Sequence, residues 1–240
     1  MSHGPCALGT SRGLALVTVL VITTLVLVLA LGVALIGSIN QAMLARHREA
    51  LALGLAARGS LELAAAHLAA ADWQAVLEGH LWASVSDGPA GGTRQLPGGD
   101  VLDLDRESNL LTCGRVEACT DAQTTAVTLD RPWGANNPRW RPFLFGPMHT
   151  LVPLTRPAAI YLVVWVADDS RERDGDARRD APAGEAGHGV LRLRTSAFGM
   201  RGGRRDAEAE LARVCPQASG GPCSPEIRVH GLRDLRHVVP

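Results

Sequence analysis

The sequence contains no lysine: all 24 basic residues among its 240 are arginine, and 24 acidic residues balance them. The formal net charge is therefore zero, and no excess of one sign attracts the chain to nucleic acid or to an acidic membrane face. Because arginine is the only strongly basic residue type, its abundance carries little information about phosphate binding. We expect no nucleic-acid partner.

A recognisable catalytic or metal-binding pattern is also absent from the sequence. The eight histidines are scattered, and none stands at position i+4 from another beside a glutamate, as the ligands of a zinc protease do. Gly9 to Gly13 match the G-x-S-x-G pattern of a hydrolase nucleophile, but that motif needs a strand before it and a helix after it inside an α/β sheet. Here it directly precedes a long apolar segment. We therefore expect a protein that is not an enzyme and that carries no metal or cofactor.

Charge is missing altogether from Gly13 to Gln41. A helix needs about 20 apolar residues to cross the roughly 30 Å hydrocarbon core of a bilayer, so residues 14–41 are predicted to form a transmembrane helix. The apolar part of a secretory signal peptide is only about 7–15 residues long, which favours a segment that stays in the membrane. A buried helix of a soluble protein is disfavoured because such helices usually keep a polar face.

Four of the five cysteines form two local pairs, Cys113 with Cys119 and Cys215 with Cys223. Such pairs are typical of disulfides, which form in oxidising compartments outside the inner membrane. Zinc is the alternative, but zinc ligand pairs are typically about two to four residues apart. Cys6 precedes the span and is expected to stay unpaired. The charges that flank the span are nearly balanced, so the cysteines decide the expected orientation: a cytoplasmic N-terminus and a periplasmic C-terminal domain.

The helical pattern continues beyond the span, over residues 42–85. Leucines recur there at spacings of about three, four or seven, which predicts an amphipathic continuation of the helix with an apolar stripe. The leucines of the stripe are Leu44, Leu51, Leu55, Leu61 and Leu68. Because no proline lies between Asn40 and Pro89, we expect the helix to run to about Leu81.

Beyond a turn-rich boundary from Ser86 to Gly99 the pattern becomes strand-like, so residues 86–240 are predicted to form a β-rich head domain. The segment from Ile160 to Val166 is β-branched and aromatic, as in a central strand. Residues 189–195 and 205–214 alternate apolar and charged residues, which predicts strands with one wet face. The other expected strands are 101–104, 126–129, 150–152 and 226–230. The fold class is α+β, with a long N-terminal helix packed on an antiparallel sheet.

Two segments of the head are open to more than one interpretation. The carboxylates from Asp168 to Asp180 are numerous enough to wrap a Ca²⁺ ion, but they do not follow the EF-hand pattern and the arginines between them would repel a cation. A solvated, exposed loop from Asp168 to Gly187 is therefore favoured. Four aromatic residues in a proline-rich stretch are expected to cover the sheet rather than to form a contact patch. These are Trp133, Trp140, Phe143 and Phe145.

The stretch from Ser11 to Leu20 resembles the start of a type IV prepilin. In that family a short basic leader ends in glycine and is removed by a prepilin peptidase at the cytoplasmic face, and the apolar helix follows uncut. The resemblance implies a leader of residues 1–13 with Arg12 as its basic residue. Cleavage would fall between Gly13 and Leu14, and the new terminus would be methylated. Thr18 departs from the pattern, because the fifth mature residue of major pilins is usually glutamate.

The C-terminal half resembles the ending of PilX-type pilus assembly proteins, in which a strand precedes an acidic loop, a Gly-rich turn and an Arg-rich strand. The likeness covers about 159–214 as well as about 11–81. It implies a minor pilin-like structural or assembly protein, inserted in the inner membrane and incorporated into or priming a pilus fibre. Its implied partners are other pilins and minor pilins through the N-terminal helix, the prepilin peptidase, and a tip adhesin. The alternatives are a K-type minor pseudopilin of a type II secretion system, and a membrane-anchored periplasmic binding domain.

Overall fold

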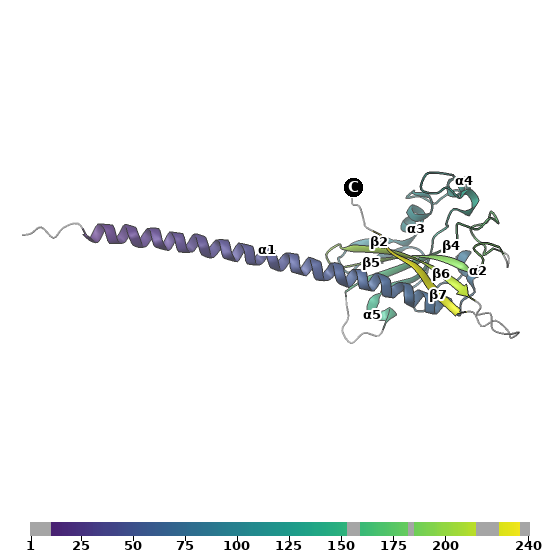
Figure 1. The fold of residues 1–240 in the computed structure, drawn as a ribbon, viewed down its shortest axis with the longest axis horizontal. Coiled ribbons are helices and arrows are strands. Elements are labelled where there is room, and N and C mark those ends of the chain that lie inside the picture. The colour runs from purple at the N-terminus through teal and green to yellow at the C-terminus, as the bar shows by residue number, and fades with distance from the viewer. Residues whose placement is uncertain (1–10, 153–158, 182–184, 215–225, 236–240) are drawn as a thin grey trace, which may run out of the picture. The chain divides into compact units, whose positions relative to one another are not determined.

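The computed structural model describes residues 11–152, 159–181, 185–214 and 226–235. The chain divides into two compact units, Met1–Arg48 and Glu49–Pro240. Figure 1 marks most of the helices and strands with the labels used below.

The first unit consists of the N-terminal part of helix α1, which spans Ser11–Leu68. Its most apolar window has a mean hydropathy of 3.0, and none of that window is buried against other parts of the protein. The hydroxyls of its polar residues donate to carbonyls one turn earlier: Thr23 to Leu20, Thr24 to Val21, and Ser38 to Leu35. The helix is therefore long and apolar enough to span a membrane, and these hydroxyls need no partner outside it.

Helix α1 ends at Leu68, earlier than the predicted end at about Leu81. The Asp72 side chain accepts a hydrogen bond from the Gln74 amide and caps a separate short helix, α2 (Trp73–Leu77). The Trp73 indole N–H donates to the Leu68 carbonyl at 2.9 Å, which satisfies a backbone acceptor at the end of α1. The predicted boundary was wrong because this local capping outweighs the helix-favouring composition of the segment.

Only part of the predicted apolar stripe of α1 packs on the sheet. Leu61 and Leu68 are fully buried, but Leu51 and Leu55 are 56% and 71% exposed. Leu44, in the first unit, is also exposed. Small side chains occupy much of the buried face, because they allow the helix to approach the sheet closely. The buried residues of α1 are Leu53, Ala56, Ala57, Ser60, Leu61, Ala64, Ala65 and Leu68.

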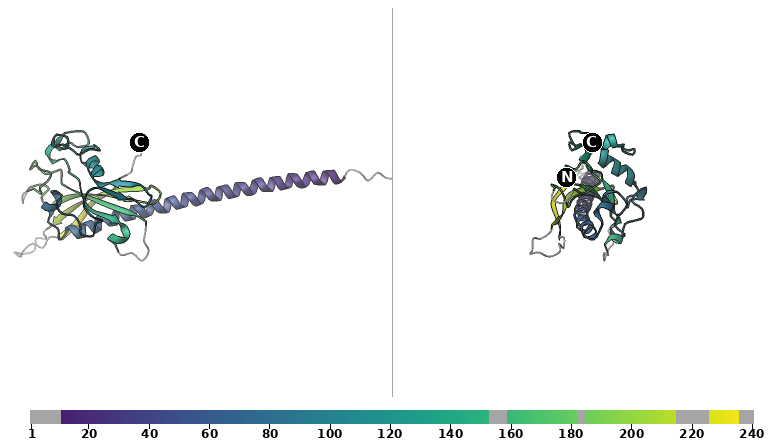
Figure 2. Two further views of the ribbon diagram at one scale, coloured as in Figure 1. Left: turned by 180° about the vertical axis from the view of Figure 1, so that it is seen from behind. Right: turned by 90° about the vertical axis from the view of Figure 1, so that its right-hand side faces the viewer.

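The head contains a five-stranded antiparallel sheet in the order β3-β4-β5-β6-β7, which confirms the α+β class. All eight residues of β4 are buried, as predicted for a central strand. Figure 2 shows this sheet from two further directions. The strands are β3 (Arg141–Pro147), β4 (Tyr161–Asp168), β5 (Val190–Phe198), β6 (Arg204–Val214) and β7 (Glu226–Leu235).

Between Gly79 and Val152 the predicted strands are only partly present. Strand β2 (Val101–Asp103) exists and pairs with β1 (Thr93–Gln95). Residues 126–129 are not a strand, and residues 150–152 overlap the short helix α5 (Met148–Leu151). Strand β3 was not predicted because its prolines disfavour strands; it lies at an edge of the sheet, where proline is tolerated. The remaining elements are α3 (Leu104–Cys113), α4 (Asp121–Thr125) and the 3₁₀ helix η1 (Gly134–Asn136).

Both faces of the sheet are covered by apolar cores. On one face α1 from Leu53 onward packs against β4, β5 and β6. On the other face β2 and the start of α3 pack against Tyr161 and Trp165 of β4. Trp140, Phe143 and Phe145 are buried on these faces, which confirms that they cover the sheet, whereas Trp133 is 39% exposed. The head is therefore a three-layer arrangement whose middle layer is the sheet (Figure 2).

Candidate functional site

The predicted prepilin site lies at the beginning of α1. The peptide bond between Gly13 and Leu14 falls within the first turn of the helix, which starts at Ser11. Arg12 belongs to the same turn. The apolar segment that a prepilin peptidase would leave as the new N-terminus is therefore helical from its start.

The disulfide between Cys113 and Cys119 is present and closes the loop that follows α3. Gly114 caps α3 in a left-handed conformation with φ of 72°, and its N–H donates to the Leu110 carbonyl. The bond therefore holds together a turn that α3 and its glycine cap already shape. Cys6, Cys215 and Cys223 lie outside the described residues, so the second predicted pair is not described.

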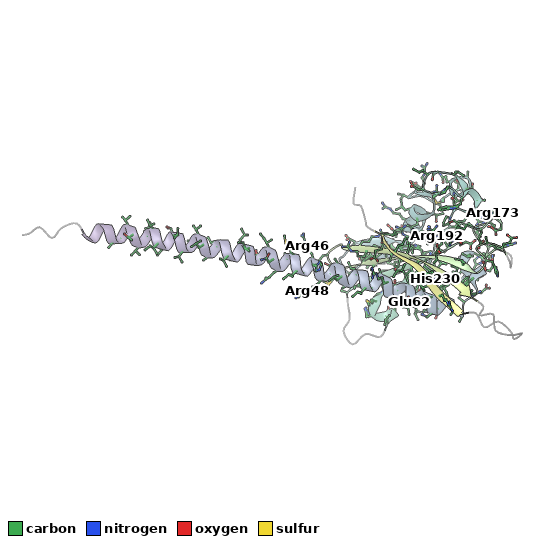
Figure 3. The ribbon with its side chains drawn as sticks, in the orientation of Figure 1. Arg46, Arg48, Glu62, Arg173, Arg192 and His230 are labelled. Atoms are coloured by element: carbon green, nitrogen blue, oxygen red, sulfur yellow. A yellow bond between two sulfur atoms is a disulfide. The ribbon has the colours of Figure 1, made fainter. Side chains whose placement is uncertain are left out.

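The side of α1 that faces away from the sheet carries an apolar and charged surface in the second unit. We call Leu51, Leu55, Arg58 and Glu62 the outer face; all four are exposed. Arg58 forms an ion pair with Asp234 of β7, which holds the edge of the sheet to the helix. Figure 3 labels Glu62 on α1. Two leucines one turn apart in this exposed position present a contiguous apolar patch on the helix.

Polar contacts other than the Arg58–Asp234 ion pair also attach the helix to the sheet, in addition to its apolar core. The hydroxyls of Ser60 and Thr195 lie 2.7 Å apart in a buried position. Glu49 accepts a hydrogen bond from the Arg201 amide at 3.0 Å, in the turn between β5 and β6. These contacts fix which side of α1 faces the sheet, and so which side remains exposed.

The alternating charges of β5 and β6 lie on the sheet face opposite α1, but that face is not wet as predicted. The side chains of Arg194, Asp206 and Glu208 are 24%, 3% and 14% exposed. Arg194 pairs with Glu208 at 3.2 Å, and the Ser196 hydroxyl donates to Asp206 at 2.5 Å. These side chains are largely covered by other parts of the head. Because buried charges are costly unless they are paired, they compensate one another within the sheet.

A cavity of about 490 Å³ lies beside this charged face. Its walls include the end of α3 with Cys113, the two tryptophans Trp133 and Trp140, and Arg192. The Arg192 guanidinium lies over both indole rings, 5.8 Å and 5.6 Å from their centres. Figure 3 labels Arg192 on the sheet. A cavity of this size lined by aromatic and charged side chains has the dimensions of a small-ligand site.

Three carboxylates meet where β4 ends, and we call Asp168, Glu172 and Asp180 the acidic cluster. One oxygen of each lies within 4.8 Å of the others. Asp168 and Glu172 are only 2% and 4% exposed, so the expectation of a solvated loop is wrong for these residues. Among the described residues, Asp168 Oδ1 and both carboxylate oxygens of Glu172 accept no hydrogen bond by distance and angle, although the two carboxyl groups lie close enough to share a proton.

Burial dominates the electrostatics of the acidic cluster. Removal from water and the nearby Glu172 carboxylate raise the pKa of Asp168 to about 9. Burial likewise raises the pKa of Glu172 to about 7. The loop is folded tightly by side chains that accept backbone N–H groups: Asp169 from Arg171, Asp174 from Asp176, and Asp176 from Arg178.

Sequence reasoning noted the carboxylates of this loop but not their convergence. The only sequence signal was that Asp168 comes directly after an apolar run and forms the last residue of β4, which places its side chain at the edge of the core. The spacing of Glu172 and Asp180 follows no regular motif, because the intervening turns set their positions.

Comparison of the chain with models of protein families, with curated proteins and with solved structures finds no match.

Proposed function

We propose that this protein is a minor pilin-like structural and assembly protein of a type IV pilus. The observation that carries the proposal is that the two parts of α1 expose different surfaces. Its first part is apolar on all sides and long enough to span a membrane, and its second part buries one face on its own sheet while Leu51 and Leu55 remain exposed. A protein that works by assembly needs such a surface and needs no active site.

In this proposal the helix acts first in the inner membrane and then in the fibre. The apolar N-terminal part holds the protein in the bilayer, with the head in the periplasm. When the subunit leaves the membrane, the same apolar surface is buried against the helices of neighbouring pilins, because exposed apolar area is unfavourable in water. The outer face then extends this contact to the head.

Processing by a prepilin peptidase is the first experimental test. Coexpression of the full chain with such a peptidase should remove residues 1–13 and leave Leu14, N-methylated, as the new terminus. Gly13→Leu should block this cleavage. Gly32→Ala is the matched control, because a side chain at Gly32 meets nothing within 4 Å and the residue lies in the same helix. Intact Met1 in the wild-type protein, or normal processing of Gly13→Leu, would contradict the proposal.

A membrane-anchored binding domain is the second candidate, and the cavity beside Trp133 and Trp140 is the observation that favours it. The two functions make different demands on α1. A binding domain needs only an anchor, so replacing the span with an unrelated transmembrane helix should leave it active, whereas an assembly protein should lose function. A K-type pseudopilin would share the helix, and secretion-channel genes beside this gene, in place of other prepilin genes, would favour it.

A further inference from the structure

The acidic cluster poses a physical problem, because several carboxylate oxygens are buried together without a partner. Burying a carboxylate without a hydrogen bond or a counter-charge is costly, and most buried polar groups in proteins have a partner. Asp168 and Glu172 are more than nine-tenths buried, and their unpartnered oxygens lie beside the Asp180 carboxylate. Three carboxylates in contact also repel one another unless a cation or a proton compensates them.

We propose that Asp168, Glu172 and Asp180 bind a Ca²⁺ ion. This site is independent of the proposed function, since it lies in the head and involves no residue of α1. The spacing of the three oxygens fits the ion. Ca²⁺ binds oxygen at about 2.3–2.6 Å, so two ligands on opposite sides of the ion are separated by about 4.6–5.2 Å. All three oxygens lie within 4.8 Å of one another, so one ion with bonds of this length can reach all of them.

The donor set favours a hard cation. All three side chains supply carboxylate oxygens, which suit Ca²⁺ and Mg²⁺ better than softer metals. The neighbouring His188 holds its Nδ1 2.5 Å from the Ala181 carbonyl oxygen and 3.6 Å from Asp180 Oδ2, so this nitrogen faces protein oxygens. Mg²⁺ demands near-ideal octahedral geometry and usually keeps several of its waters, which a cluster buried this deeply does not favour.

The backbone around the cluster is shaped to hold Glu172. Gly187 has a φ of +92°, and a Cβ at this position would come within 2.4 Å of Glu172 Cγ. Asn136 of η1 donates to the Glu172 carbonyl, and its own Oδ1 is buried without a partner. The Gly189 amide donates to Asp180 Oδ1 at 2.7 Å, which orients the third carboxylate. The ligand set is thus positioned by separate parts of the chain.

The arginines of the loop do not oppose this site, contrary to the argument from sequence. Arg171 pairs with Asp169 at 3.0 Å and with Glu210 at 2.9 Å. Arg178 pairs with Asp121 at 3.3 Å, and Arg173 is exposed. The guanidinium groups of Arg171 and Arg178 are therefore paired with carboxylates outside the cluster. Their positions between the acidic residues in the sequence do not place them at the cluster in the structure.

Calorimetric titration of the full chain in detergent, after removal of metal with EDTA, tests the site. We expect wild-type protein to bind Ca²⁺ with about one ion per chain, and its Tm to rise with Ca²⁺ concentration, because a ligand that binds only the folded state stabilises it. Mg²⁺ should have a smaller effect at equal concentration. Glu172→Gln preserves the shape of the side chain and should weaken Ca²⁺ binding by about tenfold or more. Glu185→Gln is the matched control, since Glu185 is an exposed residue of the same loop and should leave binding unchanged.

The outcomes distinguish compensation of the acidic cluster by a bound cation from compensation by a shared proton. If the cluster only shares a proton, wild-type protein will bind no Ca²⁺ even at millimolar concentration, which overturns the proposal. A Ca²⁺ affinity retained by Glu172→Gln, or an equal response to Mg²⁺, also overturns it. If Glu172→Gln does not fold, the wild-type titration and Asp180→Asn, whose side chain is 21% exposed, still decide the question.

Discussion

The two parts of α1 differ in what covers their apolar side chains. From Ala15 to Arg48 no residue of the helix is buried, whereas from Glu49 to Leu68 one side of the helix is buried on the sheet. Leucine occurs on both sides of the second part, buried at Leu53 and Leu61 and exposed at Leu51 and Leu55. Position around the helix, rather than residue type, therefore decides which leucines stabilise the head and which remain available to a partner.

The largest effect on stability should come from the buried side of the second part. Leu61 is fully buried in the core between α1 and the sheet. Leu61→Ala should lower the free energy of unfolding of the head by about 2–5 kcal/mol, through lost burial and the cavity that remains. Leu55→Ala, the same change on the exposed side, should alter it by less than about 0.5 kcal/mol. Urea unfolding of both variants in detergent measures the difference, and equal losses would mean that the two sides are not distinct.

A change on the opposite side of the sheet should destabilise the head without affecting the assembly role of α1. The double change Cys113→Ser and Cys119→Ser should lower the free energy of unfolding. A disulfide that closes a 15-residue loop is worth about 3 kcal/mol, and this shorter loop should contribute less. Incorporation into fibres should stay at the wild-type level, because this turn lies away from the helix. Peptide mapping without reductant should first show these two cysteines linked, and free thiols at both positions would contradict the periplasmic location of the head.

The smallest effect on stability should come from Asp234, which pairs with Arg58 of the outer face. The hydrogen bond and charge of Arg58 lower the pKa of Asp234 below its ordinary value of 3.8. Ionised Asp234 therefore favours the folded state above that value, and its contribution is lost as the pH falls through the lowered pKa. Asp234→Asn should slightly destabilise the head at neutral pH and have no effect at strongly acidic pH. Urea unfolding of both proteins at the two pH values measures this, and a larger effect in acid would contradict it.

The fold was predictable where the residue pattern is regular over a whole element. The uncharged run before Gln41 and the apolar run from Ile160 to Val166 identify α1 and β4, and the alternation after Arg204 identifies β6. The end of α1 was not predictable, because one aspartate cap and one indole hydrogen bond set it. Which leucines of the apolar stripe are buried was not predictable either, because alanines that allow close packing form much of the buried side of α1.

The candidate sites depend more on tertiary structure than the fold does. Nothing in the spacing of Asp168, Glu172 and Asp180 indicates that their oxygens meet, because tight turns of the loop bring them together. The cysteine pair at Cys113 and Cys119 was predictable, since six positions separate its members and a short turn is enough to join them. Sites formed within one turn follow from sequence, whereas sites formed between turns require the structure.

Fibre incorporation of a variant with a charged outer face tests the central claim most directly. Leu55→Glu places a charge where the proposal requires an apolar contact between subunits, and the exposure of Leu55 indicates that the head will still fold. Leu129→Glu is the matched control, because Leu129 is 97% exposed and lies in the head outside α1. Both variants are introduced into a deletion strain, and protein in sheared fibres is compared with protein in the membrane. The account predicts that Leu55→Glu accumulates in the membrane but is depleted from fibres while Leu129→Glu matches wild type; equal incorporation of the two would show that α1 is only an anchor.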